Sequence, residues 1–532
     1  MELCADLEAA RMRCYLVEKL RVKFDSIYLW TDSKITLYWI RSSKFQKDVF
    51  VYNRVQEIQQ LTANDNWNHC PGSINPADLL TRGVSAQTLL SCETWLNGPS
   101  WLYNDINHRK YFRRATREDF IYNGSFHEAV GSVLLFAQLF GVMPVTGVKA
   151  KDIRGLSFSY FSIIFIYSLI VFISLAFYFS TTLYFTFCQQ LRLENIGIHL
   201  LVIFSLSRIV IKAFLDPVIF YGSIVCIYYK FGNLARQWPK LMQKWEKIER
   251  NLPEHPTQLS KAALAQRIKM VAIVVLMMSL IEHLLNIITI VHYANYCNTG
   301  QDPVQQVFKS QLSQLFYITE FSVFKAIFGK LVNVIATFTW NYMDLFVMVV
   351  SIGLSDKFRQ VNASLFRMKG KVTSESYWSQ HRDHYRSLCR LCEDIDNAIS
   401  FITMFSFSNN LYFICVQLLR SLNKMPSFAH TLYFWFSLVF LIGRTLAVSL
   451  YSAEINDESK RPVQVFRCVP KESWCLEVKR FSEEVNTDIV ALSGMKFFHL
   501  TRTLVLSVAG TIVTYELVLI QFHVQEGYLG CY

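Results

Sequence analysis

Residues 332–355 read VNVIATFTWNYMDLFVMVVSIGLS, a run that is apolar almost throughout and contains a single residue of the charged types, Asp344. A helix needs about 20 such residues to cross the hydrocarbon core of a bilayer. In lipid the backbone has to satisfy its own hydrogen bonds, and a helix does so within one segment. The stretch therefore predicts a membrane-spanning helix.

The composition of the whole chain agrees with this prediction. Of its 532 residues, 52% are hydrophobic, 15% are aromatic and 18% are charged, whereas soluble domains average about 25% charged residues. This disfavours a disordered chain, a solenoid of charged repeats and a simple soluble enzyme. The net charge of +12 fits basic cytoplasmic loops better than a nucleic-acid-binding face.

Further apolar runs on both sides of this stretch predict an all-α membrane protein with seven transmembrane helices. Two runs are weaker than the others, because one carries Lys212 and Asp216 and another carries Asn409 and Asn410. The predicted spans are 158–186, 209–229, 267–292, 332–355, 398–420, 429–452 and 495–522.

Lysine and arginine are concentrated in the connections that follow the second, fourth and sixth spans. The positive-inside rule therefore predicts a cytoplasmic N-terminus and an extracellular C-terminus. This orientation is inverted relative to that of a G-protein-coupled receptor. The two halves of the chain do not repeat, so an inverted-repeat transporter has little support.

Ionisable side chains at membrane depth are costly and are candidates for function. With their polar and aromatic neighbours, they give a set of candidate ligand-binding residues. These are Glu282, His283, Glu320, Trp340, Asn341 and Asp344. The alternative for each charged residue is an interhelical ion pair or a snorkelling side chain, an explanation that suits Arg444 and Arg502 better than a ligand site.

The fourth predicted span carries the clearest local pattern. Asn341 and Asp344 are three residues apart and share one helix face, and Trp340 precedes Asp344 by four residues. A carboxylate and an amide beside an aromatic ring suit a polyol, which hydrogen-bonds through its hydroxyls and stacks its C–H face on the ring. Such a trio also occurs by chance in aromatic-rich helices.

The last predicted span contains polar and aromatic residues at matching intervals. Thr514 and Gln521 are seven residues apart, as are Tyr515 and Phe522, so each pair lies along one stripe of the helix. A polar stripe among aliphatic residues can line a pore, with bulky residues acting as a gate by dewetting. The alternative is ordinary helix packing through small polar residues.

Residues 514–522 of this last span read TYELVLIQF. This motif, Thr-Tyr followed by five mostly apolar residues and Gln-Phe, resembles the hallmark of insect gustatory receptors. Three further stretches resemble the sugar-receptor branch of that family. They read AQLFGVMPV at 137–145, WPKLMQKW at 238–245 and WNYMDLF at 340–346. Together the motifs cover roughly residues 120–525.

The resemblance implies a sugar-gated, non-selective cation channel in the plasma membrane of gustatory neurons. It further implies a homo- or heterotetramer of such receptors, with the seventh helices around a central pore and no enzymatic activity, metal or cofactor. Gln521 and Phe522 match the gate positions of the family. Trp340, Asn341 and Asp344 match its polar and aromatic fourth-helix segment, which implies a place in the sugar pocket.

The first hundred residues do not resemble that family. Acids on separate elements that converge on one point are what a two-metal nuclease requires. Through residues 97–102, NGPSWL, the segment is similar to the ribonuclease H region of a Pao-type retrotransposon polyprotein. That resemblance implies that Glu2, Asp32 and Asp78 are three of its four metal-binding acids. The strand that carries the first acid is not in the chain, so we expect a truncated, inactive α/β remnant.

These observations predict four parts of the chain. They are a ribonuclease H-like remnant at 1–105, a junction at 106–157, a seven-helix channel domain at 158–525 and an extracellular tail at 526–532. Two alternatives to a sugar-gated channel stay open at this point. One is a retrotransposon-derived nuclease with a membrane tail, and the other is a metabotropic seven-helix chemoreceptor.

Overall fold

The computed structural model describes residues 2–19, 27–42, 48–62, 67–72, 75, 125–150, 152–195, 200–253, 258–296, 303–422, 425 and 427–521. The chain divides into two compact units, Met1–Glu118 and Asp119–Tyr532. Each unit is described by itself.

The first unit contains short helices and strands in alternation. They are α1 (Glu2–Lys19), β1 (Leu29–Thr31), α2 (Lys34–Arg41), α3 (Val49–Leu61) and β2 (Trp67–His69). The two strands pair in parallel, with Leu29 opposite Trp67. A small core that includes Leu7, Ile40 and Ile58 packs the helices against the strands. The α/β character expected here is present, and the relation to ribonuclease H remains a prediction.

The second unit is almost entirely helical. Its elements are α8 (Phe126–Leu139), η4 (Ile153–Gly155), α9 (Ile163–Asn195), α10 (Leu200–Asn251), α11 (Gln258–Tyr296), α12 (Pro303–Gln311), α13 (Ser313–Ile318), α14 (Val323–Arg367), α15 (Glu375–Ser421), α16 (Phe428–Lys460), α17 (Val463–Phe466), η5 (Lys471–Ser473), α18 (Leu476–Thr487), β3 (Ser493–Gly494), β4 (Phe498–His499) and α19 (Arg502–Gln521). Within the described residues, α9, α10, α11, α14, α15 and α16 contain segments that are long and apolar enough to cross a membrane. Each of these six overlaps one of the first six predicted spans.

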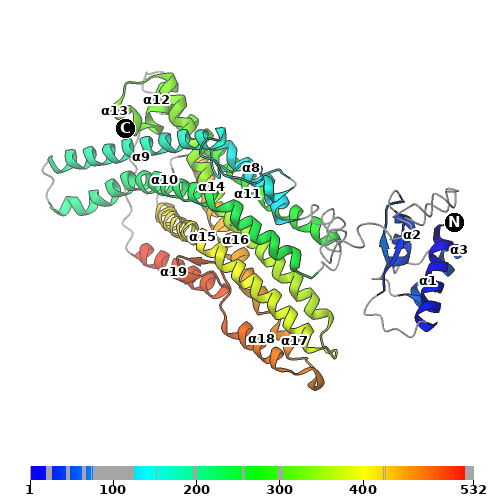
Figure 1. The fold of residues 1–532 in the computed structure, drawn as a ribbon. Helices are drawn as coiled ribbons and strands as arrows, with labels where there is room; N and C mark the ends of the chain where they lie inside the picture. Colours follow the sequence, from blue (N-terminus) through cyan, green and yellow to red (C-terminus); the bar gives the residue numbers. More distant parts are fainter. Residues whose placement is uncertain are drawn as a thin grey trace. The chain divides into compact units, whose positions relative to one another are not determined.

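The central helix of this unit is α14, which contains the stretch 332–355. In its most apolar window 89% of the residues are buried, against 44% or less in the other five long helices. The neighbours α10, α11, α15 and α16 run alongside it (Figure 1). Its threonine hydroxyls donate to carbonyls one turn earlier in the same helix, as in the hydrogen bond from Thr339 to the Ile335 carbonyl. A helix that is apolar on all sides is therefore the core around which the others pack.

The long helices continue well beyond the predicted spans. α15 begins at Glu375, although its predicted span begins at residue 398. The added turns are polar and are held by ion pairs with α18, such as Arg382–Glu477 at 2.9 Å and Arg386–Glu484 at 2.7 Å. Hydropathy does not detect them, because it measures only the apolar part of a helix.

The prediction of a last span from residue 495 to 522 is wrong at its start. Residues 493–499 form a β3–β4 hairpin instead, in which Ser493 pairs with His499. The turn is closed by a 3.0 Å hydrogen bond from the Phe497 amide to the Gly494 carbonyl, and α19 begins only at Arg502. Apolar residues such as Phe497 and Phe498 gave this segment the composition of a membrane helix, although they lie in a turn and a strand.

A glycine in the centre of α14 allows α8 and α10 to pack closely. A Cβ at Gly353 would lie 2.4 Å from Phe126 Cε2 and 3.1 Å from Trp245 Cη2. The rings of Phe126 and Trp245 are themselves stacked at 4.0 Å. We expect Gly353→Ala to destabilise the unit by about 1–3 kcal/mol through overpacking, measured as a lower midpoint of thermal unfolding in detergent.

The matched control for this substitution is Gly232→Ala in α10, where a Cβ meets nothing within 4 Å. It should leave the midpoint unchanged or raise it, because alanine is favoured over glycine inside a helix by about 0.5–1 kcal/mol. Equal midpoints for the two variants would contradict the overpacking.

Candidate functional site

The candidate site is centred on Asp344, which α14 holds fully buried. Arg444 Nε on α16 lies 2.7 Å from Asp344 Oδ2. From α15, Ser406 donates to Asp344 Oδ1 at 2.5 Å and Asn410 donates to Oδ2 at 3.0 Å. Both carboxylate oxygens are therefore satisfied, as a buried charge requires.

The Arg444 guanidinium extends this cluster to the rest of the fourth-span pattern. It donates to the Asn341 side-chain oxygen and, at 3.3 Å, to that of Asn410. Its carbon lies 4.7 Å from the centre of the Trp340 ring, which adds a cation–π contact. The structure thus brings Trp340, Asn341 and Asp344 together around one cation. The interhelical ion pair considered for Arg444 is present.

The rings of Trp340, Phe220 and Phe413 lie together beside this cluster, and we call them the aromatic wall. The Trp340 ring lies 5.7 Å from Phe220 on α10 and 4.9 Å from Phe413 on α15. Its Nε1 atom is buried and has no hydrogen-bond partner among the described residues. Gln417 lies one turn beyond Phe413, and its buried Oε1 atom also has no hydrogen-bond partner within the described part of the chain. A donor on Trp340 and an acceptor one helical turn from Phe413 are therefore left unused.

Two of the predicted ligand-binding residues lie on α11. Glu282 accepts a 2.5 Å hydrogen bond from Ser437 on α16, and Ser437 also accepts one from Gln417 at 3.2 Å. Glu282 is thereby connected through Ser437 to Gln417. His283 is the next residue on the helix and is partly buried. Glu320 lies elsewhere: it is exposed in the connection between α13 and α14.

Sequence reasoning did not assign Ser406, Asn410, Gln417 or Ser437 to the site. The one available signal was Asn410, which together with Asn409 made the fifth predicted span a weak one. Polar residues that weaken an apolar span need partners in lipid, and in α15 Asn410 binds both Asp344 and Arg444.

A second polar contact joins α10 to α15. Asp216 accepts a 2.6 Å hydrogen bond from Tyr412 and pairs with Arg420. Asp216 lies one turn from Phe220, and Arg420 follows Gln417 by three residues. Charged and aromatic groups therefore continue from the Asp344 cluster along the facing surfaces of these two helices.

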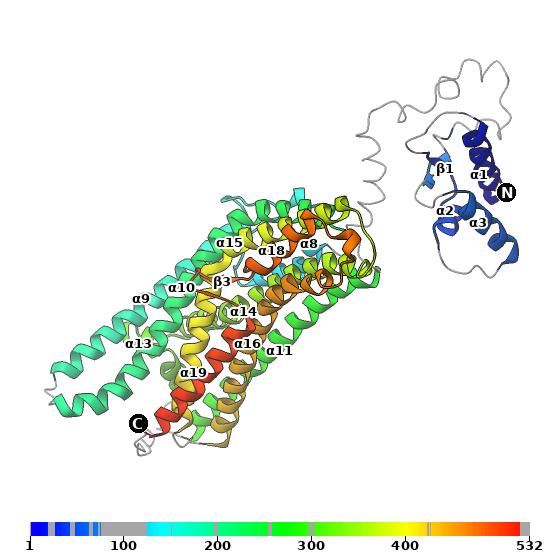
Figure 2. The same ribbon diagram turned by 90° about the horizontal axis from the view of Figure 1, so that it is seen from below.

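The predicted pore residues lie on α19, which runs beside α15 and α16 (Figure 2). Thr514, Tyr515 and Gln521 are exposed in this single chain, and Phe522 lies outside the described residues. Apolar side chains of the same helix, such as Leu506, are exposed as well. This apolar helix has free surface for further chains to pack against.

Two of the three predicted metal-binding acids of the first unit can be placed. Glu2 and Asp32 are exposed, whereas Asp78 lies outside the described residues. Burial raises the pKa of the nearby Asp6 carboxyl, and repulsion from Asp32 and Glu2 adds to the rise. Among the described residues no group of three or more His, Cys, Asp or Glu side chains is arranged to hold a metal ion.

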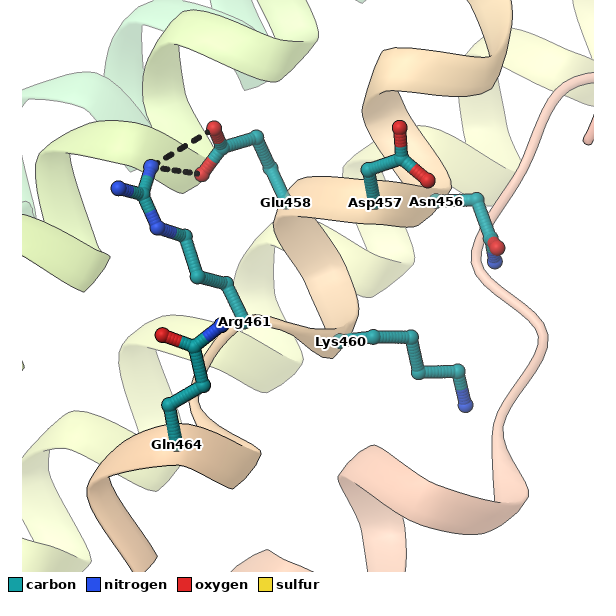
Figure 3. Close-up of a pocket in the computed structure, with 6 residues that line it drawn as sticks. All are labelled: Asn456, Asp457, Glu458, Lys460, Arg461 and Gln464. Atoms are coloured by element: carbon teal, nitrogen blue, oxygen red, sulfur yellow. Dashed lines mark hydrogen bonds and ion pairs between the residues drawn. The ribbon is translucent and has the colours of Figure 1, made fainter. Parts of the chain in front are cut away.

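A hollow of about 340 Å³ lies at the C-terminal end of α16, away from the Asp344 cluster. Its lining residues are Asn456, Asp457, Glu458, Lys460, Arg461 and Gln464 (Figure 3). The charged groups of this hollow are already paired: Glu458 with Arg461 at 3.0 Å and Asp457 with Arg502 at 2.5 Å. Trp340 on α14 and Gln417 on α15 each have a buried polar atom without a partner among the described residues, so we place the candidate ligand site between these two helices.

Comparison with known proteins gives consistent matches over most of the chain. The family model described as "Trehalose receptor" matches residues 107–531. The chain is 51% identical over 441 residues to the Drosophila melanogaster gustatory receptor for sugar taste 64f, a match that covers 83% of this chain and 90% of the relative. It is 41% identical over 444 residues to gustatory receptor 5a for trehalose from the same species, covering 82% and 95%.

The fold is similar to that of a solved insect olfactory receptor, OR5 from Machilis hrabei. Its complex with eugenol superposes with a TM-score of 0.55 at 13% identity, covering 76% of this chain and 100% of the receptor. The structure described without a ligand gives the same TM-score at 14% identity, covering 79% and 99%. At this level of identity the likeness concerns the fold.

Proposed function

Because the chain belongs to the insect sugar and trehalose gustatory receptor family, we propose that it is a sugar-gated, non-selective cation channel. Family membership confirms three expectations from the sequence: a multi-pass helical membrane protein, a sugar-type gustatory receptor, and a receptor instead of an enzyme. The pore helix, the ligand residues, the seven spans with a cytoplasmic N-terminus and the place in gustatory neurons belong to the proposal.

The observation that carries the proposal is that a donor on Trp340 and an acceptor on Gln417, one turn from Phe413, are both unused. Sugar hydroxyls both donate and accept hydrogen bonds, so they can accept from Trp340 Nε1 and donate to Gln417 Oε1. The ring faces of Trp340 and Phe413 offer apolar area for the C–H face of a pyranose. An aromatic site with a few convergent polar groups is typical of small-molecule pockets.

The Asp344 cluster has a different task in this proposal. Its charged groups bond to one another, so they hold Trp340, Asn341 and Asn410 in place and need no bonds to the sugar. A buried charge that is already paired has a lower free-energy cost beside an uncharged ligand than an unpaired charge has. Asp344 and Arg444 are therefore positioning residues, and Trp340 and Gln417 contact the sugar.

For the pore we propose α19 from four identical or related subunits. Its exposed apolar surface supports burial between chains, and Thr514 and Gln521 provide a polar stripe one helix face wide. Gln521 and Phe522 form the gate in this arrangement. Because a ligand can shift an equilibrium only by its differential affinity, the sugar has to bind the open state more tightly than the closed one.

The first unit has no role in this function. We propose that residues 1–105 are a ribonuclease H-like remnant, a view that the parallel β1–β2 pair and the placement of Glu2 and Asp32 support. The family model matches from residue 107 onward. A magnesium-dependent nuclease activity of the full chain would overturn this part of the proposal.

The test of the function is whole-cell current from cells that express the full chain, challenged with mono- and disaccharides while G proteins are blocked. A sugar-evoked cation current is the expected result. Silence with confirmed surface protein, both alone and with co-expressed sibling receptors, would overturn the channel proposal. A response that disappears under G-protein blockade would favour the metabotropic alternative.

Trp340→Phe tests the sugar contact with a minimal change. It keeps an aromatic ring against Phe413 and Arg444 but removes the Nε1 donor. Loss of one hydrogen bond of about 1 kcal/mol raises the half-maximal sugar concentration about fivefold. The measurement is the dose–response curve of the sugar-evoked current.

The matched control for Trp340→Phe is Trp378→Phe in α15. Trp378 also has a buried Nε1 without a partner among the described residues, but it packs against Phe466. Its removal should leave the dose–response curve unchanged. Equal shifts in the two variants, or no shift in either, would contradict the sugar contact.

A further inference from the structure

We propose that four polar residues of α15 and α16 transmit the sugar-driven movement of the Asp344 cluster to α19. They are Asp396 on α15 and Asn456, Asp457 and Lys460 on α16, and we call them the clasp. The clasp holds the segment that runs from the end of α18 through the β3–β4 hairpin to the first residue of α19. This inference rests on the proposed function, because it takes α19 as the pore helix.

Asp396 holds the hairpin from the α15 side. It is almost completely buried. Its Oδ1 atom accepts the Ser493 amide at 2.6 Å, and its Oδ2 atom accepts the Ser493 hydroxyl at 2.8 Å and the Lys496 ammonium at 2.6 Å. Three donors of one hairpin thus converge on one carboxylate, and charge-assisted bonds of this kind are the strong ones.

The C-terminal end of α16 holds the same segment at other points. Lys460 Nζ donates to the carbonyls of Val485, Asn486 and Asp488 at 2.6–3.1 Å, which satisfies carbonyl groups at the end of α18. Asn456 donates to the Val490 carbonyl at 3.3 Å.

The last of these α16 contacts reaches α19 itself, since Asp457 pairs with Arg502 at 2.5 Å. Figure 3 shows Asn456, Asp457 and Lys460 on one side of the helix, with Glu458 and Arg461 on the other. The second side is used differently: Glu458 bonds to Arg359 and Asn362 of α14.

The hairpin between these contacts is strained. Met495 and Lys496 have φ values of 49° and 64°, a left-handed conformation that costs non-glycine residues of the order of 1 kcal/mol each. A Cβ at Gly494 would lie 2.3 Å from the Phe498 ring, so the turn is also tightly packed. A strained turn persists only where its surroundings hold it, and here Asp396 holds it through Ser493 and Lys496.

The helices that carry the clasp also carry the Asp344 cluster. On α15, Ser406 lies ten residues from Asp396, about 15 Å at the rise of an α-helix. On α16, Arg444 lies thirteen residues from Asp457, about 20 Å by the same measure. The segment leading into α19 is therefore held by two separate helices, and any change in the spacing of those helices around Asp344 changes the position of α19.

A charge exchange between Asp457 and Arg502 tests this coupling in the channel. Both side chains are partly or largely exposed, so breaking the pair has little effect on folding. We expect Asp457→Arg and Arg502→Asp each to reduce the maximal sugar-evoked current about tenfold at equal surface amount. The double exchange should restore it to within about twofold of the wild type, as expected for directly coupled residues.

Asp396→Asn tests the α15 contact against a matched control. Asparagine has one acceptor oxygen instead of two, so it cannot keep all three hydrogen bonds that Asp396 accepts from Ser493 and Lys496. The control is Asp394→Asn, two residues away, which breaks an exposed ion pair with Lys244. A reduced maximal current in Asp396→Asn alone is expected. Unchanged currents in both, or failure of the charge exchange to rescue, would overturn the clasp.

A measurement without sugar separates this inference from the proposed function. In the purified full chain, Ser406→Ala removes the α15 hydrogen bond to Asp344 Oδ1 and keeps the ion pair with Arg444. It should accelerate hydrogen–deuterium exchange at residues 488–500, because it loosens α15 where it meets α14. Exchange there that is unaffected by Ser406→Ala would overturn the coupling. A wild type without sugar-evoked current would instead overturn the proposed function, and the exchange result then decides the clasp alone.

Discussion

Replacing Arg444 by methionine should remove the receptor from the cell surface. Methionine fills much of the same volume, but it leaves the Asp344 carboxylate buried without its cation. Breaking a buried ion pair on one side costs about 3–5 kcal/mol, a large share of the 5–15 kcal/mol by which domains are stable. The measurement is surface biotinylation at equal expression, together with the thermal unfolding midpoint in detergent.

The double variant Asp344→Asn with Arg444→Met separates the charge effect from a general packing defect. Asparagine at 344 can still accept from Ser406 or Asn410, and no buried charge is left. Surface expression should therefore recover, because removing both members of a buried pair is often close to neutral. If Arg444→Met alone reaches the surface at wild-type levels, the ion pair does not stabilise the bundle. If the double variant is as poor as the single one, packing and not charge is the cause.

The sequence predicts the helices of the second unit well and their contacts poorly. Hydropathy locates α9, α10, α11, α14, α15 and α16, because lipid requires an apolar surface on each. Their polar extensions are missed, since those turns are stabilised by ion pairs such as Arg382–Glu477 with an element far along the chain. The hairpin at 493–499 is missed because its turn depends on backbone angles that are unusual for Met495 and Lys496.

The candidate site shows the same division between local and distant information. Helix spacing places Asn341 and Asp344 on one face of α14, and the structure joins both to Arg444. Arg444 lies on α16, a different helix. Sequence spacing relates residues within one helix only, so it could not identify Asp344 as the partner of Arg444. The sequence predicted Trp340 as a site residue, but it could not show that Trp340 Nε1 and Gln417 Oε1 lack hydrogen-bond partners. Whether a polar atom has a partner depends on the side chains that surround it in the fold.

Substituting Phe522 by alanine should open the channel without sugar. In the proposed assembly this ring narrows the pore at the end of α19, and a bulky apolar constriction excludes water. Removing it shifts the closed–open equilibrium by about 1.4 kcal/mol or more, which is about a tenfold rise in basal current. Gln521→Ala, at the last described residue of α19, should alter the basal current or the dose–response curve to a smaller extent. Whole-cell recording at zero sugar measures both.

The control for Phe522→Ala is the same change at Phe161, an exposed ring ahead of α9, which should leave basal current unaffected. The comparison is made at equal surface amount, because a variant that reaches the surface poorly gives little current, just as a closed channel does. The larger contacts of α19 among the described residues are those with α15 and α16. A leak that appears in Phe522→Ala but not in Phe161→Ala assigns the constriction to this helix end. Unchanged basal current and sugar response in both Gln521→Ala and Phe522→Ala would remove the gate from α19, and the polar stripe of Thr514 and Gln521 would then be explained by packing between subunits.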